Sequence, residues 1–241
     1  MQTTKMKTAI CFTGTGRSLN HTWENIKKNL IEPHQDCDIF AHLTPTKHVD
    51  KLQKLLDYKQ TVKTKIEKDL KFDVKDLRWQ HMWPMGTHSG PEPQQTYLNM
   101  LYSRSRCGQI LADHSLKNNI NYDKVIFSRL DVEYYDPLPE MELDKICVPD
   151  FHHFTHLQGT GCNDRFAASS YDNMMTYFNL YHNIPKFIAV GGKLHAESFL
   201  GWHLLTSGKK IKKYHIRFTR VRPNGDRIDS RLQNRALESR D

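Results

Sequence analysis

The sequence predicts a single domain of the α/β class, in which buried strands alternate with helices. Short apolar runs are followed by longer segments whose apolar residues recur every three or four positions, a pattern typical of strands joined by helices. The 241 residues are enough to bury one sizeable core. We find no internal repeat, low-complexity tract or shift in composition that would indicate a domain boundary.

The first predicted strand and helix lie at the start of the chain. An apolar run over residues 7–13 ends at Gly14 and predicts a buried strand. Residues 22–31 carry apolar side chains at helical spacing and stop before Pro33, so they predict a helix.

Two more strands and the longest helix follow. Residues 37–43 predict the second strand, and the alternation over residues 60–66 predicts the third. Between them, residues 48–58 form an amphipathic segment that predicts a helix. Residues 94–116 predict the longest helix.

The second half of the chain begins with the clearest strand. Residues 124–128 combine β-branched and apolar side chains and run directly into a polar cluster, and residues 146–149 predict another short strand. Helices are predicted at residues 173–181 and 195–206, and Gly208 closes the second of these.

The composition is that of a folded, basic protein. Lys and Arg number 35 against 27 Asp and Glu, which gives a formal net charge of +8. Aromatic residues make up 10% of the chain, more than a disordered chain would hold. No run approaches the roughly 18 apolar residues of a membrane-spanning helix, and the apolar run at residues 9–12 is too short for a secretory signal. We therefore expect a cytoplasmic protein.

The cysteines support this expectation. They are scattered, odd in number and never spaced as Cys-x-x-Cys, which fits neither a disulfide framework nor a zinc ribbon. We expect five reduced and mostly buried thiols, at Cys11, Cys37, Cys107, Cys147 and Cys162.

Two basic stretches raise the question of an anionic partner. Residues 209–213 contain four lysines, and residues 217–240 carry recurrent arginines interleaved with acids. We interpret both as solvated surface rather than as a nucleic-acid-binding face, and an anionic substrate would equally account for the charge. We expect residues 1–223 to form the domain and residues 224–241 a basic tail.

A glycine-rich turn, Gly14-Thr15-Gly16-Arg17, follows the first predicted strand. Glycines let the backbone approach a ligand closely, a helix N-terminus favours phosphate, and Arg17 adds a forked phosphate donor. The turn is not the dinucleotide fingerprint, because Leu19 stands at the third glycine position, and it is not a Walker A loop. Gly14, Gly16 and Arg17 are therefore candidate nucleotide contacts, and a plain tight turn is the alternative.

Two carboxylates follow the clearest strand. Asp131 and Glu133 lie two residues apart, so in an extended segment both point to one side. Carboxylates at a strand end can hold Mg²⁺ or Mn²⁺ and leave sites for water and a diphosphate, and ligands gather beyond the C-terminal ends of strands in open α/β sheets. The alternatives are a pair of solvated acids, or neutralisation of Asp131 by Arg129.

Two further acidic residues are candidates for proton transfer. Asp164 lies in a glycine-flanked polar loop and could act as a base toward a sugar hydroxyl, with an Asx turn or a helix cap as the alternative. Glu197 opens the last predicted helix, where the helix dipole alone favours an acid.

Other side chains extend the list of candidates. His215 is a candidate third metal ligand or diphosphate contact. Trp79, Trp83 and Tyr97 could stack on a base or a sugar ring, with packing in the core as the alternative.

Taken in order, several short motifs resemble a known family. They are the Gly-Arg turn after the first strand, Cys-Asp-Ile-Phe-Ala-His, Gln-Gln-x-Tyr, Phe-Ser-Arg-Leu-Asp-Val, Asn-Asp-Arg-Phe-Ala, His-Ala-Glu-Ser-Phe-Leu and Phe-Thr-Arg-Val-Arg-Pro. This series is similar to small glycosyltransferases of bacterial polysaccharide clusters and large viruses, over roughly residues 7–223.

The resemblance implies a GT-A-like fold, a single domain with a mixed, mostly parallel sheet flanked by helices. It also implies transfer of a sugar from a nucleotide-diphosphate-sugar donor to a glycan hydroxyl. Asp131-Val132-Glu133 would match an Asp-x-Asp-type metal site for Mn or Mg, with Glu in place of the second Asp. The donor side would include Gly14 and Arg17 of the turn, and we also count Gly16, Arg129 and Asp131 among the candidate donor contacts.

On the acceptor side, the resemblance implies roles for Asp164 and Glu197, either of which could take the acceptor proton. The expected partners are the donor and a glycan or lipid-linked glycan acceptor, with a peripheral contact at the inner face of a membrane and no nucleic acid. The alternatives are a nucleotidyltransferase, a basic nucleic-acid-binding module with steeply salt-dependent binding, and a binding protein that has lost catalysis.

Overall fold

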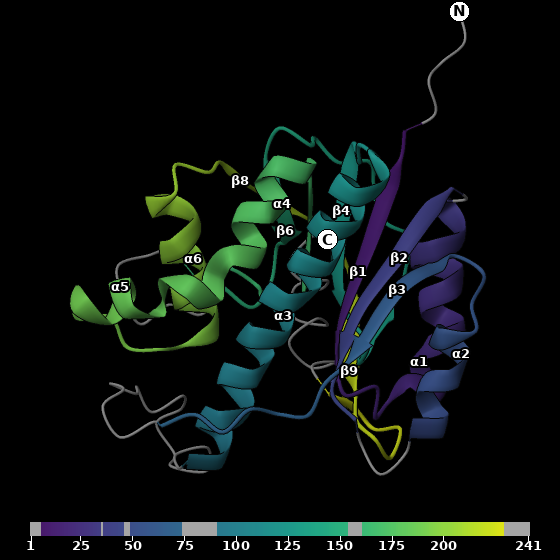
Figure 1. Cartoon of the computed structure of the whole chain (residues 1–241), viewed down its shortest axis with the longest axis horizontal. Helices are drawn as coiled ribbons and strands as arrows, with labels where there is room; N and C mark the ends of the chain where they lie inside the picture. Colours follow the sequence, from purple (N-terminus) through teal and green to yellow (C-terminus); the bar gives the residue numbers. More distant parts are fainter. Residues whose placement is uncertain (1–5, 35, 46–48, 74–90, 154–160, 229–241) are drawn as a thin grey trace, which may run out of the picture.

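The computed structural model describes residues 6–34, 36–45, 49–73, 91–153 and 161–228. In this part of the chain the architecture is α/β, with a mixed, mostly parallel sheet of seven strands between two layers of helices (Figure 1). A smaller antiparallel sheet of three strands adjoins the first.

The large sheet places its parallel strands together. Its strands, in order across the sheet, are β3 (Thr61–Ile66), β2 (Cys37–Leu43), β1 (Thr8–Gly14), β4 (Lys124–Arg129), β7 (Phe166–Ser169), β6 (Ile146–Pro149) and β8 (Ile211–Tyr214). The first four are mutually parallel, β7 is antiparallel to both of its neighbours, and β8 is parallel to β6. The register aligns Gly14 with Leu43 and Thr13 with Arg129, so three strands end level at one edge.

Helices cover both faces of this sheet (Figure 1). One layer contains α1 (Leu19–Ile26), which continues through a π turn (Lys27–Ile31) and a 3-10 turn (Glu32–His34), and α2 (Gln53–Leu56), preceded by a 3-10 turn (Val49–Leu52). The other layer contains α3 (Pro91–Asn118), α4 (Tyr171–Phe178), a 3-10 turn (Asn179–Asn183), α5 (Ile184–Ala189) and α6 (Ala196–Thr206).

Side-chain alternation along β1 explains why both faces are covered. Ala9 and Cys11 belong to the hydrophobic cluster that includes Leu101 of α3, whereas Ile10 and Phe12 belong to the cluster on the α1 side. A strand buried on both faces has no polar face, so it appears in the sequence as one continuous apolar run.

The small sheet brings the end of the described chain to the edge of the large one. It consists of β5 (Val132–Tyr134), β9 (Phe218–Val221) and β10 (Arg227–Ile228), with β9 in the centre. Ser18 Oγ donates a hydrogen bond of 2.6 Å to the carbonyl of Val221, which fixes β9 beside the turn after β1.

Most predicted elements are confirmed. The strands predicted at residues 7–13, 37–43, 60–66, 124–128 and 146–149 are present, as are the helices predicted at 94–116 and 195–206. Three predicted helices are broken: residues 22–31 end in a π turn, 48–58 hold a 3-10 turn and one short helix, and 173–181 pass from α4 into a 3-10 turn. Among the described residues, five strands were not predicted, including β8, which overlaps the basic stretch 209–213.

The five cysteines are all buried and carry free thiols, as predicted. Within the described ranges, no helix is long and apolar enough to cross a membrane.

Candidate functional site

A cavity of about 150 Å³ lies at the edge of the large sheet where β1, β2 and β4 end. Its wall comes from the turn after β1, from Thr44 and Asp69 beyond β2 and β3, from one side of α3, from the end of β4 and from the residues after β9. The lining residues are Thr13, Gly14, Thr15, Gly16, Arg17, Ser18, Thr44, Asp69, Thr96, Asn99, Met100, Ser103, Arg129, Leu130, Asp131, Val221, Arg222 and Pro223.

The turn predicted to contact a nucleotide forms one wall of this cavity. Gly14 and Gly16 have φ of +127° and +63°, a region that L side chains rarely adopt. A Cβ at Gly16 would lie 2.1 Å from Cδ2 of Leu52, so this position also lacks the space for a side chain. Arg17 is exposed, and its Nε donates to Thr15 Oγ1 at 3.1 Å. The glycines therefore permit a turn that brings Arg17 to the cavity.

Asp131 lines the cavity in an ion pair with Arg129. Arg129 Nε and Nη2 donate to the two carboxylate oxygens of Asp131 at 2.8 and 2.7 Å. Burial by itself would raise the pKa of Asp131, but Arg129, Arg220 and Arg165 together outweigh it and lower that pKa. Asp131 is therefore an ionised carboxylate in cationic surroundings.

The other two predicted metal ligands are engaged elsewhere. Arg227 donates to both oxygens of Glu133 at 2.9 and 2.8 Å, and His215 Nδ1 lies 3.1 Å from an oxygen of Asp150. Neither Glu133 nor His215 lines the cavity. Among the residues that the structure describes, no group of three or more His, Cys, Asp or Glu side chains is arranged to hold a metal ion. The predicted set of Asp131, Glu133 and His215 is thus not brought together.

Asp164 belongs to a buried charged cluster behind the cavity. It is 4% exposed, and it faces Arg104 of α3, which is 1% exposed. Arg104 Nη2 donates to the carbonyl of Asp164 at 2.8 Å and lies 3.6 Å from its carboxylate. The guanidinium also lies 4.8 and 4.9 Å from the ring centres of Phe127 and Tyr177.

Electrostatics connect this cluster to the cavity. Burial would raise the pKa of Asp164, but Arg104 and Arg165, followed by Arg129 and Arg220, lower it. The pKa of Asp131 is also lowered by three of these residues, Arg129, Arg165 and Arg220. One group of arginines therefore keeps both aspartates ionised.

Glu197, on α6, has a raised pKa, in contrast to the lowered pKa of Asp131 and Asp164. It is 7% exposed, and burial together with the negative charge of Asp164 raises its pKa to about 7. Its Oε2 lies 3.3 Å from Nε2 of His195. Among the described residues, Asp164 and Glu197 are thus near one another but outside the cavity lining.

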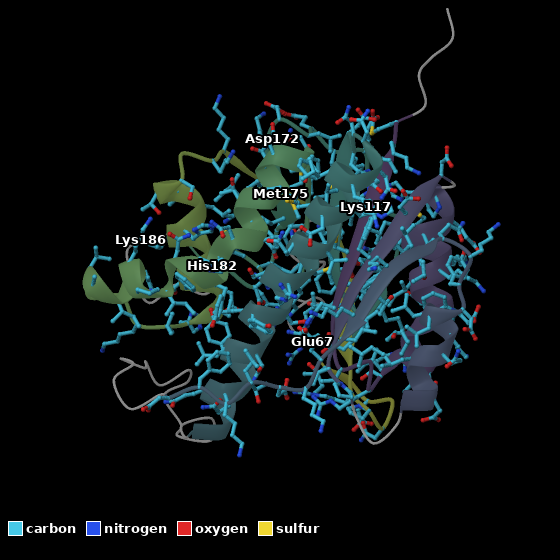
Figure 2. All side chains as sticks on the ribbon, in the orientation of Figure 1. Glu67, Lys117, Asp172, Met175, His182 and Lys186 are labelled. Atoms are coloured by element: carbon cyan, nitrogen blue, oxygen red, sulfur yellow. The ribbon has the colours of Figure 1, made fainter. Side chains whose placement is uncertain are left out.

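Ser103, His42 and Glu67 form a hydrogen-bonded chain that was not predicted, in which Ser103 and His42 are buried and the side chain of Glu67 is 26% exposed. His42 Nδ1 lies 2.9 Å from Ser103 Oγ in the cavity wall, and its Nε2 lies 2.8 Å from Glu67. Figure 2 shows Glu67 where β3 ends, between the sheet and α3. Hydrogen bonds from Lys65 and then His42 lower the pKa of Glu67 to about 2. These residues come from three separate elements, so no local sequence signal could have grouped them.

Two amide side chains of α3 hold the segment that follows β3. Asn99 accepts from the amide of Leu70 at 2.8 Å and donates to its carbonyl at 3.0 Å. Gln95 does the same for Phe72, at 2.9 and 2.6 Å. Because Asn99 also lines the cavity, this pairing fixes the wall near Asp69.

Of the three aromatic residues predicted to stack on a ligand, Trp79 and Trp83 lie outside the described residues. Tyr97 is buried beside the charged cluster, and burial followed by Asp164 raises its pKa well above the ordinary value.

Comparison with known proteins identifies the family. The model of one family, described as a domain of unknown function (DUF7796), matches residues 3–221. The chain belongs to the DUF7796 family. The match covers the cavity wall of this DUF7796 domain from Thr13 to Val221. No curated protein matches the chain.

Proposed function

We propose that this DUF7796 protein is a glycosyltransferase that moves a sugar from a nucleotide-diphosphate-sugar donor to a glycan hydroxyl. The observation that carries the proposal is the position and chemistry of the cavity. It lies beyond the C-terminal ends of parallel strands, where ligands of open α/β sheets bind. Its wall also contains a positive-φ glycine turn and, among the described residues, three arginines.

The diphosphate side is the turn after β1 together with the end of β4. Arg17, Arg129 and Arg222 bring guanidinium groups to this side of the cavity. Guanidinium forks suit phosphate oxygens, and the backbone can approach closely at Gly14 and Gly16.

The nucleoside side is the part of the wall formed by α3 and by the residues that follow β2 and β3. Thr44, Asp69, Asn99 and Ser103 supply hydroxyl, carboxylate and amide groups there. Such groups suit the hydroxyls of a ribose and the polar edge of a base. An adjoining hollow shares Asp69, Thr96 and Asn99 with the cavity, which gives room for a ligand longer than a diphosphate.

The fold supports a GT-A-like assignment at the level of architecture. The large sheet is mixed and mostly parallel, helices flank it, and the cavity lies at the ends of the parallel strands. These features agree with the single nucleotide-binding domain that the motif resemblance implies.

For the acceptor proton we favour Glu197 over Asp164. A general base works best when its pKa is near the pH of the reaction, and the pKa of Glu197 is about 7. Asp164 is held ionised by Arg104, and its charge is one cause of the raised pKa of Glu197. In this scheme Glu197 takes the proton, and the negative charge of Asp164 helps to raise the pKa of Glu197.

The acceptor in this proposal is a glycan or a lipid-linked glycan. A lipid-linked acceptor would bring the protein, acting in the cytoplasm, to the inner face of a membrane. The net charge of +8 suits both an anionic donor and an anionic lipid surface.

The proposal is tested by thermal unfolding of the full chain with a panel of nucleotide sugars and nucleoside diphosphates. A ligand that binds only the native state raises the melting temperature. We expect a shift with one nucleotide class, at least halved in Arg17→Ala and unchanged in Lys117→Ala. Lys117 lies about 20 Å along α3 from the cavity residue Ser103, at the far end of the helix in Figure 2, and its loss removes the same charge. No shift with any nucleotide would contradict the proposal.

A further inference from the structure

The cavity presents arginines where the sequence predicts a metal site. Resting on the proposed function, we infer that the donor diphosphate is held by guanidinium groups and that binding requires no divalent ion. The residues in and around the cavity do not fit an Mn or Mg site, for reasons of ion pairing, charge and position.

Both predicted carboxylate ligands are already neutralised. Asp131 accepts two hydrogen bonds from Arg129, and Glu133 accepts two from Arg227. Each contact is a fork in which both carboxylate oxygens are used, the strongest arrangement for this pair of groups. A metal ion would have to share carboxylate oxygens that each already accept a hydrogen bond from an arginine.

The position of Glu133 also separates it from the cavity. Glu133 is the middle residue of β5 and pairs with Thr219 of β9, and its side chain extends to Arg227 on β10. It therefore serves as a cross-strand contact of the small sheet. Only Asp131, of the three predicted ligands, lines the cavity.

The surroundings of Asp131 are strongly cationic. Its pKa is lowered by Arg129, Arg220 and Arg165, and the same three arginines lower the pKa of Asp164. A dication beside these guanidinium groups would be repelled, whereas an anion would be attracted. The site thus has the charge of an anion-binding site.

Arg17 is available to such an anion. In the part of the chain that the structure describes it forms no ion pair with a carboxylate, and its Nε is oriented by Thr15. Arg129, at the end of β4, also lines the cavity, and Asp131 fixes the plane of its guanidinium group. The fork of Arg17 and the positive charge of Arg129 together suit the phosphates of a nucleoside diphosphate.

The same groups would stabilise the leaving group. In the transfer, the bond between the sugar carbon and the β-phosphate oxygen breaks, and its electron pair stays on the phosphate. The acceptor oxygen forms the new bond to that carbon, and its proton passes to the base. Negative charge therefore grows on the diphosphate, where Arg17 and Arg129 can neutralise it as a metal ion otherwise would.

Isothermal titration of the full chain with UDP, GDP, ADP, CDP and TDP, in EDTA and then in excess MnCl₂, tests the inference. We expect one nucleotide to bind in EDTA with a Kd no more than threefold weaker than in Mn²⁺. Arg17→Ala should weaken binding by about tenfold in both buffers, since a charge-assisted hydrogen bond is lost, while Lys117→Ala should not change it.

A second variant separates the two roles of Asp131. If Asp131 only orients Arg129, Asp131→Asn still binds the nucleotide in EDTA, within about tenfold of the wild type, and Mn²⁺ changes the Kd of either protein by no more than about threefold. Binding that appears only with Mn²⁺, and that Asp131→Asn abolishes, would overturn the inference but keep the proposed function. Binding of no nucleoside diphosphate in either buffer would overturn both.

Discussion

Arg129 and Asp131 form a two-bond ion pair where β4 ends, with N–O distances of 2.8 and 2.7 Å. Both residues line the cavity, and Arg129 lowers the pKa of Asp131 and also that of Asp164 in the buried cluster behind it. The end of β4, where the sequence predicts a metal site, is therefore surrounded by arginines that lower the pKa of both aspartates.

The turn after β1 should not tolerate a side chain at Gly16. In Gly16→Ala the alanine must adopt a positive φ, which lowers the free energy of unfolding by about 1–2 kcal/mol. The overlap of its Cβ with Leu52 lowers it by about 1–3 kcal/mol more. Gly208→Ala is the matched control, because Gly208 also has positive φ (+69°) but has no atom within 4 Å of the added Cβ. Urea unfolding should show the larger loss for Gly16→Ala. Equal losses would show that Leu52 moves aside without cost.

The buried pair of Arg104 and Asp164 should be needed for stability. Asp164→Asn removes the charge beside a guanidinium that is 1% exposed, and breaking a buried pair costs about 3–5 kcal/mol. The control is Glu133→Gln, whose partner Arg227 has a side chain that is 54% exposed, so its loss should cost less than about 1 kcal/mol. Chemical denaturation measures both. Similar values for the two variants would contradict the burial of this charge.

Glu197 should make stability fall as the pH rises from about 4.5 to about 7. Its pKa is about 7 in the folded protein and near 4.5 when the chain is unfolded, so the folded state holds the proton more tightly in this window. The loss is on the order of 3 kcal/mol at most. Glu197→Gln should remove this part of the slope, so it should gain stability relative to the wild type between pH 5 and pH 7.5.

The same residue should control the rate of transfer. If Glu197 is the base, the rate should rise with pH through an apparent pKa of about 7, and Glu197→Gln should lose most of the activity at every pH. An unchanged pH–rate profile in Glu197→Gln would leave it with a structural role only.

Hydrogen exchange at the amide of Leu70 should report on the hydrogen bonds that Asn99 and Gln95 of α3 make to the segment after β3. Because Asn99 accepts its hydrogen bond, this amide should exchange slowly with solvent in the wild type. In Asn99→Ala the exchange at Leu70 should become faster, while Phe72, which bonds to Gln95, should keep more of its protection. Gln95→Ala should give the reverse pattern. Equal acceleration at both positions in either variant would show that the segment opens as one unit.

The buried strands of the large sheet could be predicted because burial leaves a local signal. β1, β2 and β4 are continuous apolar runs, since both of their faces are covered. β8 was missed because it is an edge strand with the sequence Ile-Lys-Lys-Tyr, and its lysines resemble a solvated surface. β7, Phe-Ala-Ala-Ser, was missed because it has only four residues and directly follows the polar triplet Asn-Asp-Arg.

The site was predictable only in part, for a similar reason. Gly14, Arg17, Arg129 and Asp131 each stand at a strand end, and parallel strand ends must meet at one edge, so their convergence could be predicted. The partner of Glu133 could not be predicted, because Arg227 lies 94 residues away on β10, which is joined to β5 through β9. Local spacing therefore suggests a metal site at two acids that are already paired, Asp131 with the neighbouring Arg129 and Glu133 with the distant Arg227.

The most direct test of the central claim is product analysis by mass spectrometry after the full chain is incubated with its nucleotide-sugar donor. In the absence of an acceptor, water takes the sugar slowly, and with a glycan acceptor the mass of the glycan increases by one sugar residue. Our account predicts release of the nucleoside diphosphate in both cases, with a rate reduced at least tenfold in Arg17→Ala. Release of a nucleoside monophosphate and a sugar phosphate would contradict it, because cleavage between the phosphates is not sugar transfer.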